Sequence, residues 1–256
     1  MRKIFKKNMR LRKIIDPISR KSLIVAFDHA VEHGPQEYEG INIDPLRIAK
    51  MAEEGGANAL IVHPGAARYL MRYSRIPLII KLTGRTSLSP KMTQAITSTV
   101  NEAEFLGAVG VACTVYVGSE FEDRMLENLA YIKRECLEKG MPLIGFMYPR
   151  VNGKKKDDPR LVRYAARLGA ELGVDIVKTY YTGSKETFQK VVRDANFTPV
   201  VAAGGEEKDE VELFKMVEDI TSSGASGMAV GRNIWKRDNG ALLLRQIKRI
   251  IYGMHQ

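Results

Sequence analysis

Long hydrophobic runs are missing from this chain of 256 residues. A membrane-spanning helix needs about 20 consecutive apolar residues, and no stretch approaches that length, so the sequence predicts no membrane span. The basic amino terminus has no apolar segment behind it and does not resemble a secretory signal. Cysteine is scarce as well, because Cys113 and Cys136 are the only two and neither belongs to a CxxC pair. A disulfide scaffold is thereby disfavoured, and we expect a reducing, cytoplasmic location.

No Pro-, Gly- or Ser-rich linker divides the chain into two large parts. We expect a basic extension over residues 1–21 and a single domain over residues 22–256. Between Arg2 and Ile14, lysines and arginines interleave with apolar residues. This pattern is compatible with an arm that binds nucleic acid or a membrane surface, but it is more typical of an amphipathic helix that closes one end of a domain. The net charge of +10 also suits a protein whose substrates carry phosphate.

From Ser22 onward, apolar runs of strand length alternate with amphipathic segments of helix length. The predicted strands are Leu23–Asp28, Asn58–His63, Pro77–Leu82, Val109–Tyr116, Pro142–Tyr148, Val174–Lys178, Pro199–Ala203 and Gly227–Val230. The predicted helices are Pro45–Glu54, Ala66–Tyr73, Thr93–Leu106, Glu120–Glu138, Pro159–Leu172, Lys185–Asp194, Asp209–Ser223 and Ala241–Tyr252. Such strand–helix units most economically close into an α/β fold of the (β/α)8 TIM barrel type. A doubly wound open sheet is the alternative, but no GxGxxG follows the first strand.

In a TIM barrel, chemistry lies at the carboxyl ends of the strands. Polar residues close several predicted strands, namely Asp28, His63, Lys81, Tyr148 and Lys178. Side chains alternate between the two faces of a strand. The residues that share a face are therefore Lys178 with Ile176 and Val174, Tyr148 with Phe146 and Ile144, and Asp28 with Ala26 and Ile24. If these faces point inward, an amine, a phenol and a carboxylate meet at one mouth of the barrel.

Lys178 ends a strand that should be buried on both faces. Burial favours the neutral amine, which is the form that attacks a carbonyl carbon. The alternative is a structural lysine whose side chain extends from the strand end to water. The position of the other polar strand ends favours the catalytic interpretation.

The last two predicted strands are followed by Ala203-Gly204-Gly205 and by Gly231-Arg232. In TIM barrels these two loops often form a phosphate site from backbone N–H groups. Glycines let an anion approach the backbone closely, and an arginine adds a charge-assisted hydrogen bond. The pair of loops therefore predicts phosphate binding.

The segment from Asp28 to His33 is dense in ionisable groups. One interpretation is a metal site that uses Asp28, His29, Glu32 and His33, with His63 as a further ligand. That site would leave Lys178 without a role. The other interpretation makes Asp28 an acid–base or orienting group and His33 a substrate contact. A purely structural role, as part of a polar turn that caps the first strand, suits His29 better than Asp28.

Four motifs occur in order: Asp-His-Ala-Val-Glu-His-Gly-Pro, Met-Tyr-Pro-Arg, Asp-Ile-Val-Lys-Thr-Tyr-Tyr-Thr-Gly and Val-Gly-Arg-Asn-Ile-Trp. Together they resemble the archaeal-type class I (DhnA-type) aldolases, and the resemblance covers essentially everything from Ser22 to Tyr252. It implies that Lys178 forms a Schiff base, that Tyr148 is the proton donor and that Asp28 assists proton transfer. It also implies that the Gly204–Gly205 and Gly231–Arg232 positions form the phosphate site.

The family includes fructose-1,6-bisphosphate aldolases and transaldolase-type sister enzymes of aromatic amino-acid biosynthesis. The sister enzymes include the synthases of 2-amino-3,7-dideoxy-D-threo-hept-6-ulosonate and of 6-deoxy-5-ketofructose phosphate. His33 and the segment Val117–Glu122 favour the bisphosphate aldolases, although Phe146 stands where those enzymes carry Trp. Ala30 and Val151 replace glycines that are frequent in the family.

The resemblance implies phosphorylated ketose and small aldehyde substrates, and no metal or organic cofactor. We do not expect binding of nucleic acid or of a membrane. We do expect a homo-oligomer, which is commonly a decamer in this family. Further candidate substrate-binding residues are His29, His33, Lys81 and Arg150. A second phosphate is expected at Arg150 or at the Lys154–Lys156 run. For Lys81 there are two alternatives to substrate binding: its charge lowers the pKa of Lys178, or it is a lysine on the surface without a role in the site.

Overall fold

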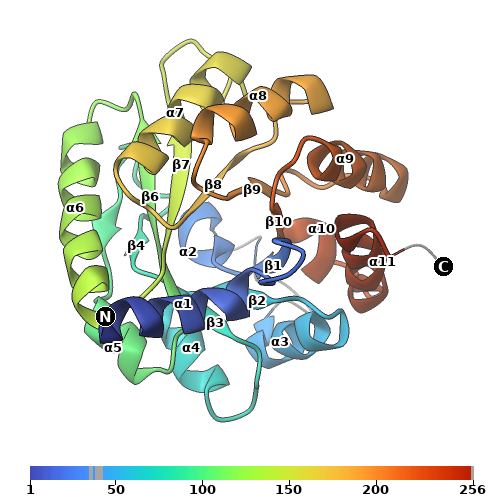
Figure 1. Cartoon of the computed structure of the whole chain (residues 1–256), viewed down its shortest axis with the longest axis horizontal. Helices are drawn as coiled ribbons and strands as arrows, with labels where there is room; N and C mark the ends of the chain where they lie inside the picture. Colours follow the sequence, from blue (N-terminus) through green and yellow to red (C-terminus); the bar gives the residue numbers. More distant parts are fainter. Residues whose placement is uncertain (35–36, 38–42, 255–256) are drawn as a thin grey trace.

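The computed structural model describes residues 1–34, 37 and 43–254, so Pro35 of the first motif and His255 lie outside the described residues. Within these residues, parallel strands close into a barrel (Figure 1). Its strands are β1 (Ser22–Ala26), β2 (Ala59–Val62), β3 (Leu78–Lys81), β6 (Gly110–Val117), β7 (Leu143–Pro149), β8 (Ile176–Tyr180), β9 (Val200–Ala203) and β10 (Gly227–Val230). Their order is β1-β10-β9-β8-β7-β6-β3-β2, which confirms the (β/α)8 barrel.

The helices surround the barrel and are α1 (Arg2–Ile14), α2 (His29–His33), α3 (Pro45–Glu54), α4 (Pro64–Leu70), α5 (Val100–Phe105), α6 (Glu122–Lys139), α7 (Pro159–Glu171), α8 (Lys185–Ala195), α9 (Glu210–Ser222), α10 (Arg232–Trp235) and α11 (Gly240–Tyr252). Among them and the rest of the described chain, no helix is long and apolar enough to cross a membrane.

The barrel closes where β1 pairs with β10, with Ser22 opposite Gly227. Gly227 has a φ of +139°, and a Cβ atom at this position would lie 1.9 Å from the carbonyl oxygen of Ser22. Only glycine fits this junction, because any side chain would collide with the neighbouring backbone.

One predicted helix, Thr93–Leu106, is wrong in its first half. There, β5 (Ala95–Ile96) pairs antiparallel with β4 (Thr83–Gly84), and the helix begins only after Thr99. The Thr99 side chain accepts a hydrogen bond from the backbone N–H of Glu102 and thereby caps α5. Threonine favours such a cap over a helix interior, which explains the late start.

Two separate cores follow from the alternation of side chains along the strands. An inner core fills the barrel, and an outer core lies between strands and helices. Ile176, Phe146 and Ala26 belong to the inner core, so the expected inward faces of β8, β7 and β1 are confirmed. Val174 is an exception: it precedes β8 and belongs to the outer core, so the alternation of this strand starts at Ile176.

Helix α1 closes the amino-terminal end of the barrel, as the amphipathic pattern predicts (Figure 1). Ile14 is fully buried and joins the inner core, against which Leu11 also packs. A Cβ atom at Gly110 would lie 2.8 Å from Cδ1 of Ile14, so this glycine makes room for the plug.

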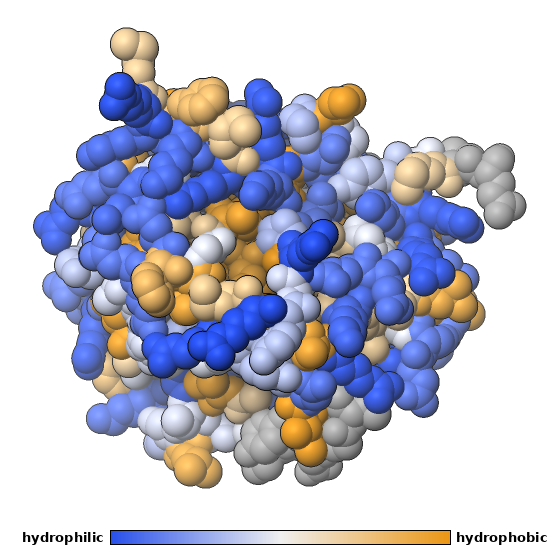
Figure 2. Space-filling view, turned by 90° about the horizontal axis from the view of Figure 1, so that it is seen from below, coloured by the Kyte–Doolittle hydropathy of each residue, from blue (hydrophilic) through white to orange (hydrophobic). Residues whose placement is uncertain are grey.

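Part of the positive charge of α1 is paired within the chain. Lys6 and Arg10 both contact Glu104 on α5, and Nζ of Lys7 lies 2.6 Å from a carboxylate oxygen of Asp175. On the face shown in Figure 2, hydrophilic residues predominate and hydrophobic ones are scattered. The helix is thus a docked part of the barrel, and its charges help to hold it there.

Candidate active site

Lys178 lies on the inner face of β8 near the carboxyl end of the barrel. The residue is 5% exposed, and Nζ lies 4.0 Å from the ring centroid of Phe146. Burial lowers the pKa of Lys178, the positive charge of Lys81 lowers it further, and the carboxylates of Asp28 and Glu32 oppose this change. The net lowering increases the share of free amine near neutral pH.

Asp28 follows β1 and precedes α2, at the same end of the barrel. Burial disfavours the charged form, but the positive charges of Lys178 and Lys81 outweigh it and lower the pKa of Asp28. Asp28 is therefore ionised, and it is an electrostatic partner of the buried amine of Lys178.

Lys81 is fully buried, so the alternative of a surface lysine is wrong. Its Nζ donates to Glu32 Oε1 at 2.8 Å and to the carbonyl of Thr83 at 3.1 Å. The hydroxyl of Tyr116 donates to the other oxygen of Glu32 at 3.0 Å, and Gln94 donates to that hydroxyl. These contacts hold the Lys81 amine in place. Its Nζ lies 5.1 Å from the centroid of the Phe146 ring that Lys178 also contacts, so the charge of Lys81 is close to Lys178.

Tyr148 lies on the inner face of β7, and its ring stacks on that of Tyr180 at a centroid distance of 4.4 Å. Burial raises the pKa of Tyr148 well above its usual value, with further increases from Tyr180 and Asp28. The phenol therefore keeps its proton and is available as a donor.

The glycines after β9 and β10 let neighbouring segments pack closely against these loops. A Cβ at Gly204 would lie 3.1 Å from Cα of Val230, and a Cβ at Gly231 would lie 2.7 Å from His29 Cε1. Asn233, which is fully buried, joins the two loops: its Nδ2 donates to the carbonyls of Gly204 and Glu206, and its Oδ1 accepts from the N–H of Lys208.

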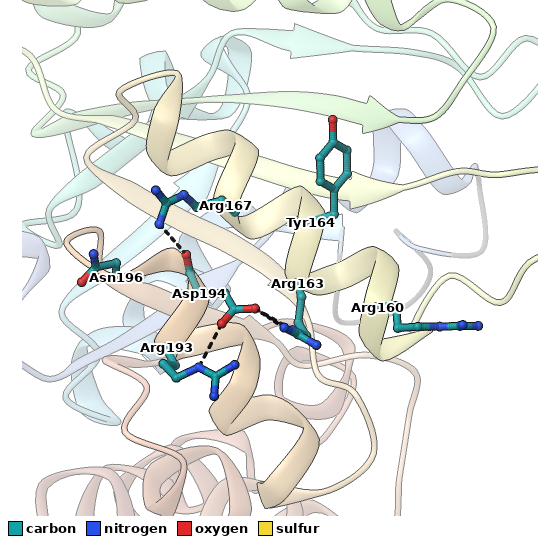
Figure 3. Close-up of a pocket in the computed structure, with 7 residues that line it drawn as sticks. All are labelled: Arg160, Arg163, Tyr164, Arg167, Arg193, Asp194 and Asn196. Atoms are coloured by element: carbon teal, nitrogen blue, oxygen red, sulfur yellow. Dashed lines mark hydrogen bonds and ion pairs between the residues drawn. The ribbon is translucent and has the colours of Figure 1, made fainter.

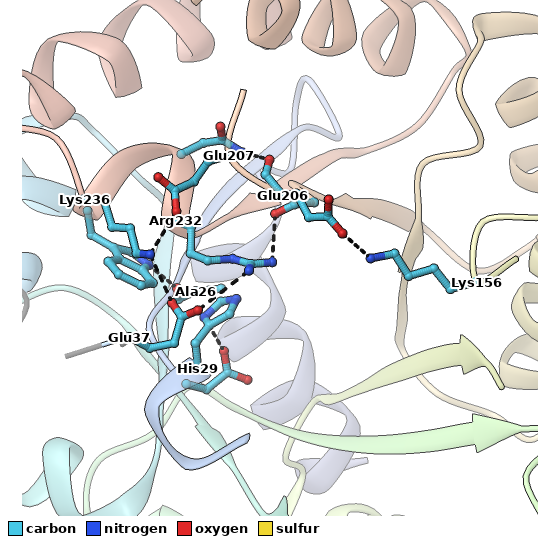
Figure 4. A network of polar contacts seen from close by, with 12 residues as sticks. Ala26, His29, Glu37, Lys156, Glu206, Glu207, Arg232 and Lys236 are labelled. Atoms are coloured by element: carbon cyan, nitrogen blue, oxygen red, sulfur yellow. Dashed lines mark hydrogen bonds and ion pairs between the residues drawn. The ribbon is translucent and has the colours of Figure 1, made fainter. Parts of the chain in front are cut away.

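Arg232 lies between the two loops and contacts Glu37 (Figure 4). Its NH2 donates to the Gly205 carbonyl at 3.3 Å, and its NH1 lies 3.7 Å from Glu37 Oε1. Lys236 lies 3.9 Å from the other oxygen of Glu37. The Nε of Arg232 has no hydrogen-bond partner among the described residues, so this guanidinium retains donor capacity for an anion.

A cavity of about 760 Å³ joins these groups at the carboxyl end of the strands. Of the site residues predicted from the sequence, those that line this cavity are His29, His33, Tyr148, Arg150, Lys178, Ala203, Gly204, Gly205, Gly231 and Arg232. Asp28 and Lys81 lie just behind this lining; Glu32 and Tyr116, which continue the Lys81 contacts, are part of it. The volume is typical of sites for small molecules.

Opposite the glycine loops, the cavity is lined by Arg85 and Arg150, whereas Lys156 reaches back to the loop after β9, where its Nζ lies 2.6 Å from Glu206 Oε1. Arg150 lies among tyrosine rings, 4.9 Å from the centroid of Tyr116 and 5.3 Å from that of Tyr180, and it donates to the Tyr180 hydroxyl. Since the loops after β3 and β7 lie across the barrel from β10, positive groups occur on two sides of the cavity.

The two imidazoles near Asp28 have reduced basicity. Burial lowers the pKa of His29 to about 4 and also lowers the pKa of His63. For the alternative of a metal centre, residues 1–34, 37 and 43–254 contain no group of three or more His, Cys, Asp or Glu placed to hold an ion. Glu32, one of its proposed ligands, instead pairs with Lys81.

Sequence reasoning did not assign a site role to Arg85, Tyr116, Gln94, Glu37 or Asn233. Asn233 stands in the fourth motif and Tyr116 ends a predicted strand, so both carried a usable signal. Arg85 and Gln94 flank the unpredicted β4–β5 pair, and nothing in the local pattern places them at the barrel mouth.

Fold and site together define a barrel protein with a buried amine at one mouth, in a cavity that the two glycine loops and Arg232 also line. A model of the DeoC/LacD family aldolases matches residues 22–237. The chain belongs to this family.

Curated relatives carry a more specific name. The fructose-bisphosphate aldolase class 1 of Thermoproteus tenax is 39% identical over 239 residues, covering 91% of this chain and 90% of that protein. The protein of the same name from Halobacterium salinarum is 35% identical, covering 92% and 93%.

Solved structures of proteins with similar names also resemble this chain. An archaeal fructose-1,6-bisphosphate aldolase, with its catalytic lysine bound covalently to the carbinolamine intermediate, superimposes with a TM-score of 0.90 at 35% identity, covering 96% of this chain and 100% of that chain. A fructose-bisphosphate aldolase from Slackia heliotrinireducens gives 0.89 at 25% identity, covering 100% and 87%.

Proposed function

We propose that this chain is a class I fructose-bisphosphate aldolase, which reversibly cleaves fructose 1,6-bisphosphate to glycerone phosphate and glyceraldehyde 3-phosphate through a Schiff base. The observation that carries the proposal is the amine of Lys178, buried against Phe146 and facing the cavity. The names of the T. tenax and H. salinarum relatives support it.

The first step is attack of the free amine of Lys178 on the C2 carbonyl of the ketose. A C–N bond forms, the carbonyl π bond breaks, and the resulting carbinolamine loses water to give an iminium ion. Tyr148 supplies the proton that lets hydroxide leave as water, because its high pKa keeps the phenol protonated.

The second step breaks the C3–C4 bond. The iminium accepts the electron pair as an enamine forms, and the C4 hydroxyl loses its proton to release the aldehyde. Asp28 is ionised beside the amine and orients it or takes this proton. The proton taken from the C4 hydroxyl by Asp28 returns to the phenolate that Tyr148 became in the first step. Tyr148 then protonates the enamine at C3, and addition of water at C2 frees the ketone and restores Lys178.

Two phosphate groups match the two positive sides of the cavity. We assign the phosphate at C1 to the loops of Gly204, Gly205, Gly231 and Arg232, because all four line the cavity and Nε of Arg232 has no partner among the described residues. Arg85 and Arg150, on the opposite side, receive the phosphate at C6. His29 and His33 contact the substrate from α2.

Location and assembly are part of the proposal. Cys113 and Cys136 are both unpaired and buried, which suits the reducing cytoplasm. We expect the functional form to be a homo-oligomer, and sedimentation velocity of the full chain measures its size.

A coupled assay of triose phosphate release from fructose 1,6-bisphosphate tests the proposal, with Lys178→Arg as the inactive variant and Lys190→Arg, on the exposed face of α8, as the matched control. We expect activity in the wild type and the control only. A sister transaldolase-type function predicts instead that the wild type condenses the three-carbon unit with aspartate semialdehyde or methylglyoxal faster than it cleaves the bisphosphate.

A further inference from the structure

A second cavity, of about 570 Å³, lies on the outside of the barrel between α7 and α8 (Figure 3). Arg160, Arg163 and Arg167 reach it from α7, and Arg193 reaches it from the end of α8. The three arginines of α7 lie on one face of the helix, because residues three or four apart are neighbours. We call this cavity the arginine groove.

The arginine groove holds more positive charge than its own carboxylate neutralises. Asp194 is the only acidic residue that lines it among the described residues, and it is shared by Arg163 at 2.6 Å and Arg193 at 3.0 Å. Arg167 donates to the Asp194 carbonyl and to Glu171 outside the groove. Arg160 is 84% exposed at its side chain and lies 3.7 Å from Asp158.

The four guanidinium groups line one groove, and Arg163 and Arg193 converge on the same carboxylate (Figure 3). Like charges repel, so an anion that binds in the groove relieves the repulsion among them. Each guanidinium has five N–H donors in a planar fork that matches the oxygens of phosphate. The donors of Arg160, and those that Arg193 does not use for Asp194, point to solvent or to the groove (Figure 3). Such a cluster favours a ligand with more than one negative group.

One aromatic side chain lines the arginine groove: Tyr164 of α7, which is 62% exposed and whose ring we call the aromatic wall. Phe197, just after α8, is 66% exposed and lies outside this lining. The guanidinium of Arg167 lies 6.0 Å from the Phe197 ring. Exposed aromatic rings beside arginines are suited to stack a planar ring while the arginines hold phosphates.

We propose that the arginine groove binds a small compound that carries at least two phosphate groups, such as inorganic pyrophosphate or a nucleoside diphosphate. This site is separate from the barrel mouth, because it lies on the outer side of α7 and α8.

Helix α7 connects the arginine groove to the catalytic strands. A Cβ atom at Gly169 of α7 would lie 2.7 Å from Cγ of Met147 and 3.0 Å from Cγ2 of Val177, so helix and strands are in close contact. Met147 and Val177 precede Tyr148 and Lys178 in sequence. A ligand that ties α7 to α8 therefore alters the rate of cleavage, a consequence that rests on the proposed function.

Isothermal titration calorimetry with pyrophosphate and with ADP tests the proposal on the full chain. To remove binding at the barrel mouth, the titrations use Arg232→Gln protein as the background. We expect saturable binding there, weakened at least tenfold by the added pair Arg160→Gln and Arg167→Gln. These two changes leave the contacts of Asp194 with Arg163 and Arg193 in place.

The matched control replaces Arg72 and Arg75, both exposed after α4, by glutamine, and we expect less than a twofold change. Tighter binding of ADP than of pyrophosphate, lost in Tyr164→Ala, would assign the aromatic wall to the base. Absence of saturable binding, or equal weakening by both pairs, overturns the proposal. It is also overturned if the groove pair changes only the assembly size in sedimentation, since the groove is then an interface between copies.

The binding measurement needs no aldolase activity, so it stands if the proposed function fails. Conversely, if pyrophosphate binds in the groove but leaves cleavage of fructose 1,6-bisphosphate unchanged, the coupling through α7 is refuted while the site remains.

Discussion

Replacing Lys81 by methionine should make the amine of Lys178 more basic. The two amines lie 5.1 Å and 4.0 Å from the centroid of one Phe146 ring, so they are no more than about 9 Å apart. At an effective dielectric constant of about 20, two unit charges at this separation repel by about 2 kcal/mol, which is slightly more than one pKa unit. Both side chains are buried, so salt screens this repulsion little.

The assay is the pH dependence of kcat/KM, whose acid limb reports loss of a proton from the essential amine. Because burial and Lys81 lower the pKa of Lys178, removal of Lys81 raises it, and the acid limb moves to higher pH by about one unit. Below the limb the variant is about tenfold slower than the wild type, and above it the two rates approach each other.

Lys81→Met leaves the Glu32 carboxylate without its cation, so a second variant is needed. The double variant Lys81→Met with Glu32→Gln removes one charge of each sign, and the acid limb should then return toward the wild-type position. Lys190→Met, on the exposed surface of α8, is the control for loss of a distant lysine. An acid limb that stays in place or moves to lower pH in Lys81→Met refutes the reasoning.

Three other changes probe separate parts of the molecule. Tyr148→Phe removes the proton donor, and kcat should fall about 100-fold with little change in KM, as steady-state kinetics will show; an unchanged kcat excludes the role. Gly231→Ala places a Cβ 2.9 Å from the carbonyl oxygen of Ala26, so KM for the bisphosphate should rise at least tenfold, and an unchanged KM argues against phosphate binding at this loop. Glu104→Gln should lower the free energy of unfolding by about 1 kcal/mol at pH 7, because its ion pairs with α1 are lost. Hydrogen bonding by Lys6 lowers the pKa of Glu104 to about 2, so in denaturant titrations this difference should be complete above pH 4.5 and vanish as pH falls through about 2; a difference that persists below pH 2 contradicts this.

Much of the barrel follows from local pattern. Each apolar run that ends on a polar residue became a barrel strand, because a strand covered on both faces needs continuous apolar sequence. The inward faces of Tyr148 and Lys178 follow from alternation alone, and the plug formed by Ile14 follows from the amphipathic spacing of α1. These features depend on neighbours in sequence, which the sequence displays directly.

The remaining features depend on contacts between distant segments. The pair β4–β5 joins short stretches around Thr83 and Ile96, and neither has strand periodicity. The Lys81–Glu32 contact links residues 49 positions apart, and it converts an apparently exposed lysine into a buried charge. Asn233 likewise acts on a loop 29 positions earlier, at Gly204. Spacing alone shows none of these partners.

The most direct measurement is mass spectrometry of the chain after borohydride reduction in the presence of fructose 1,6-bisphosphate. We expect one covalent adduct of the mass of the reduced ketose phosphate, located at Lys178 in the peptide map and absent from Lys178→Arg. An adduct on Lys81 or another lysine, or no adduct while the enzyme is turning over, contradicts it.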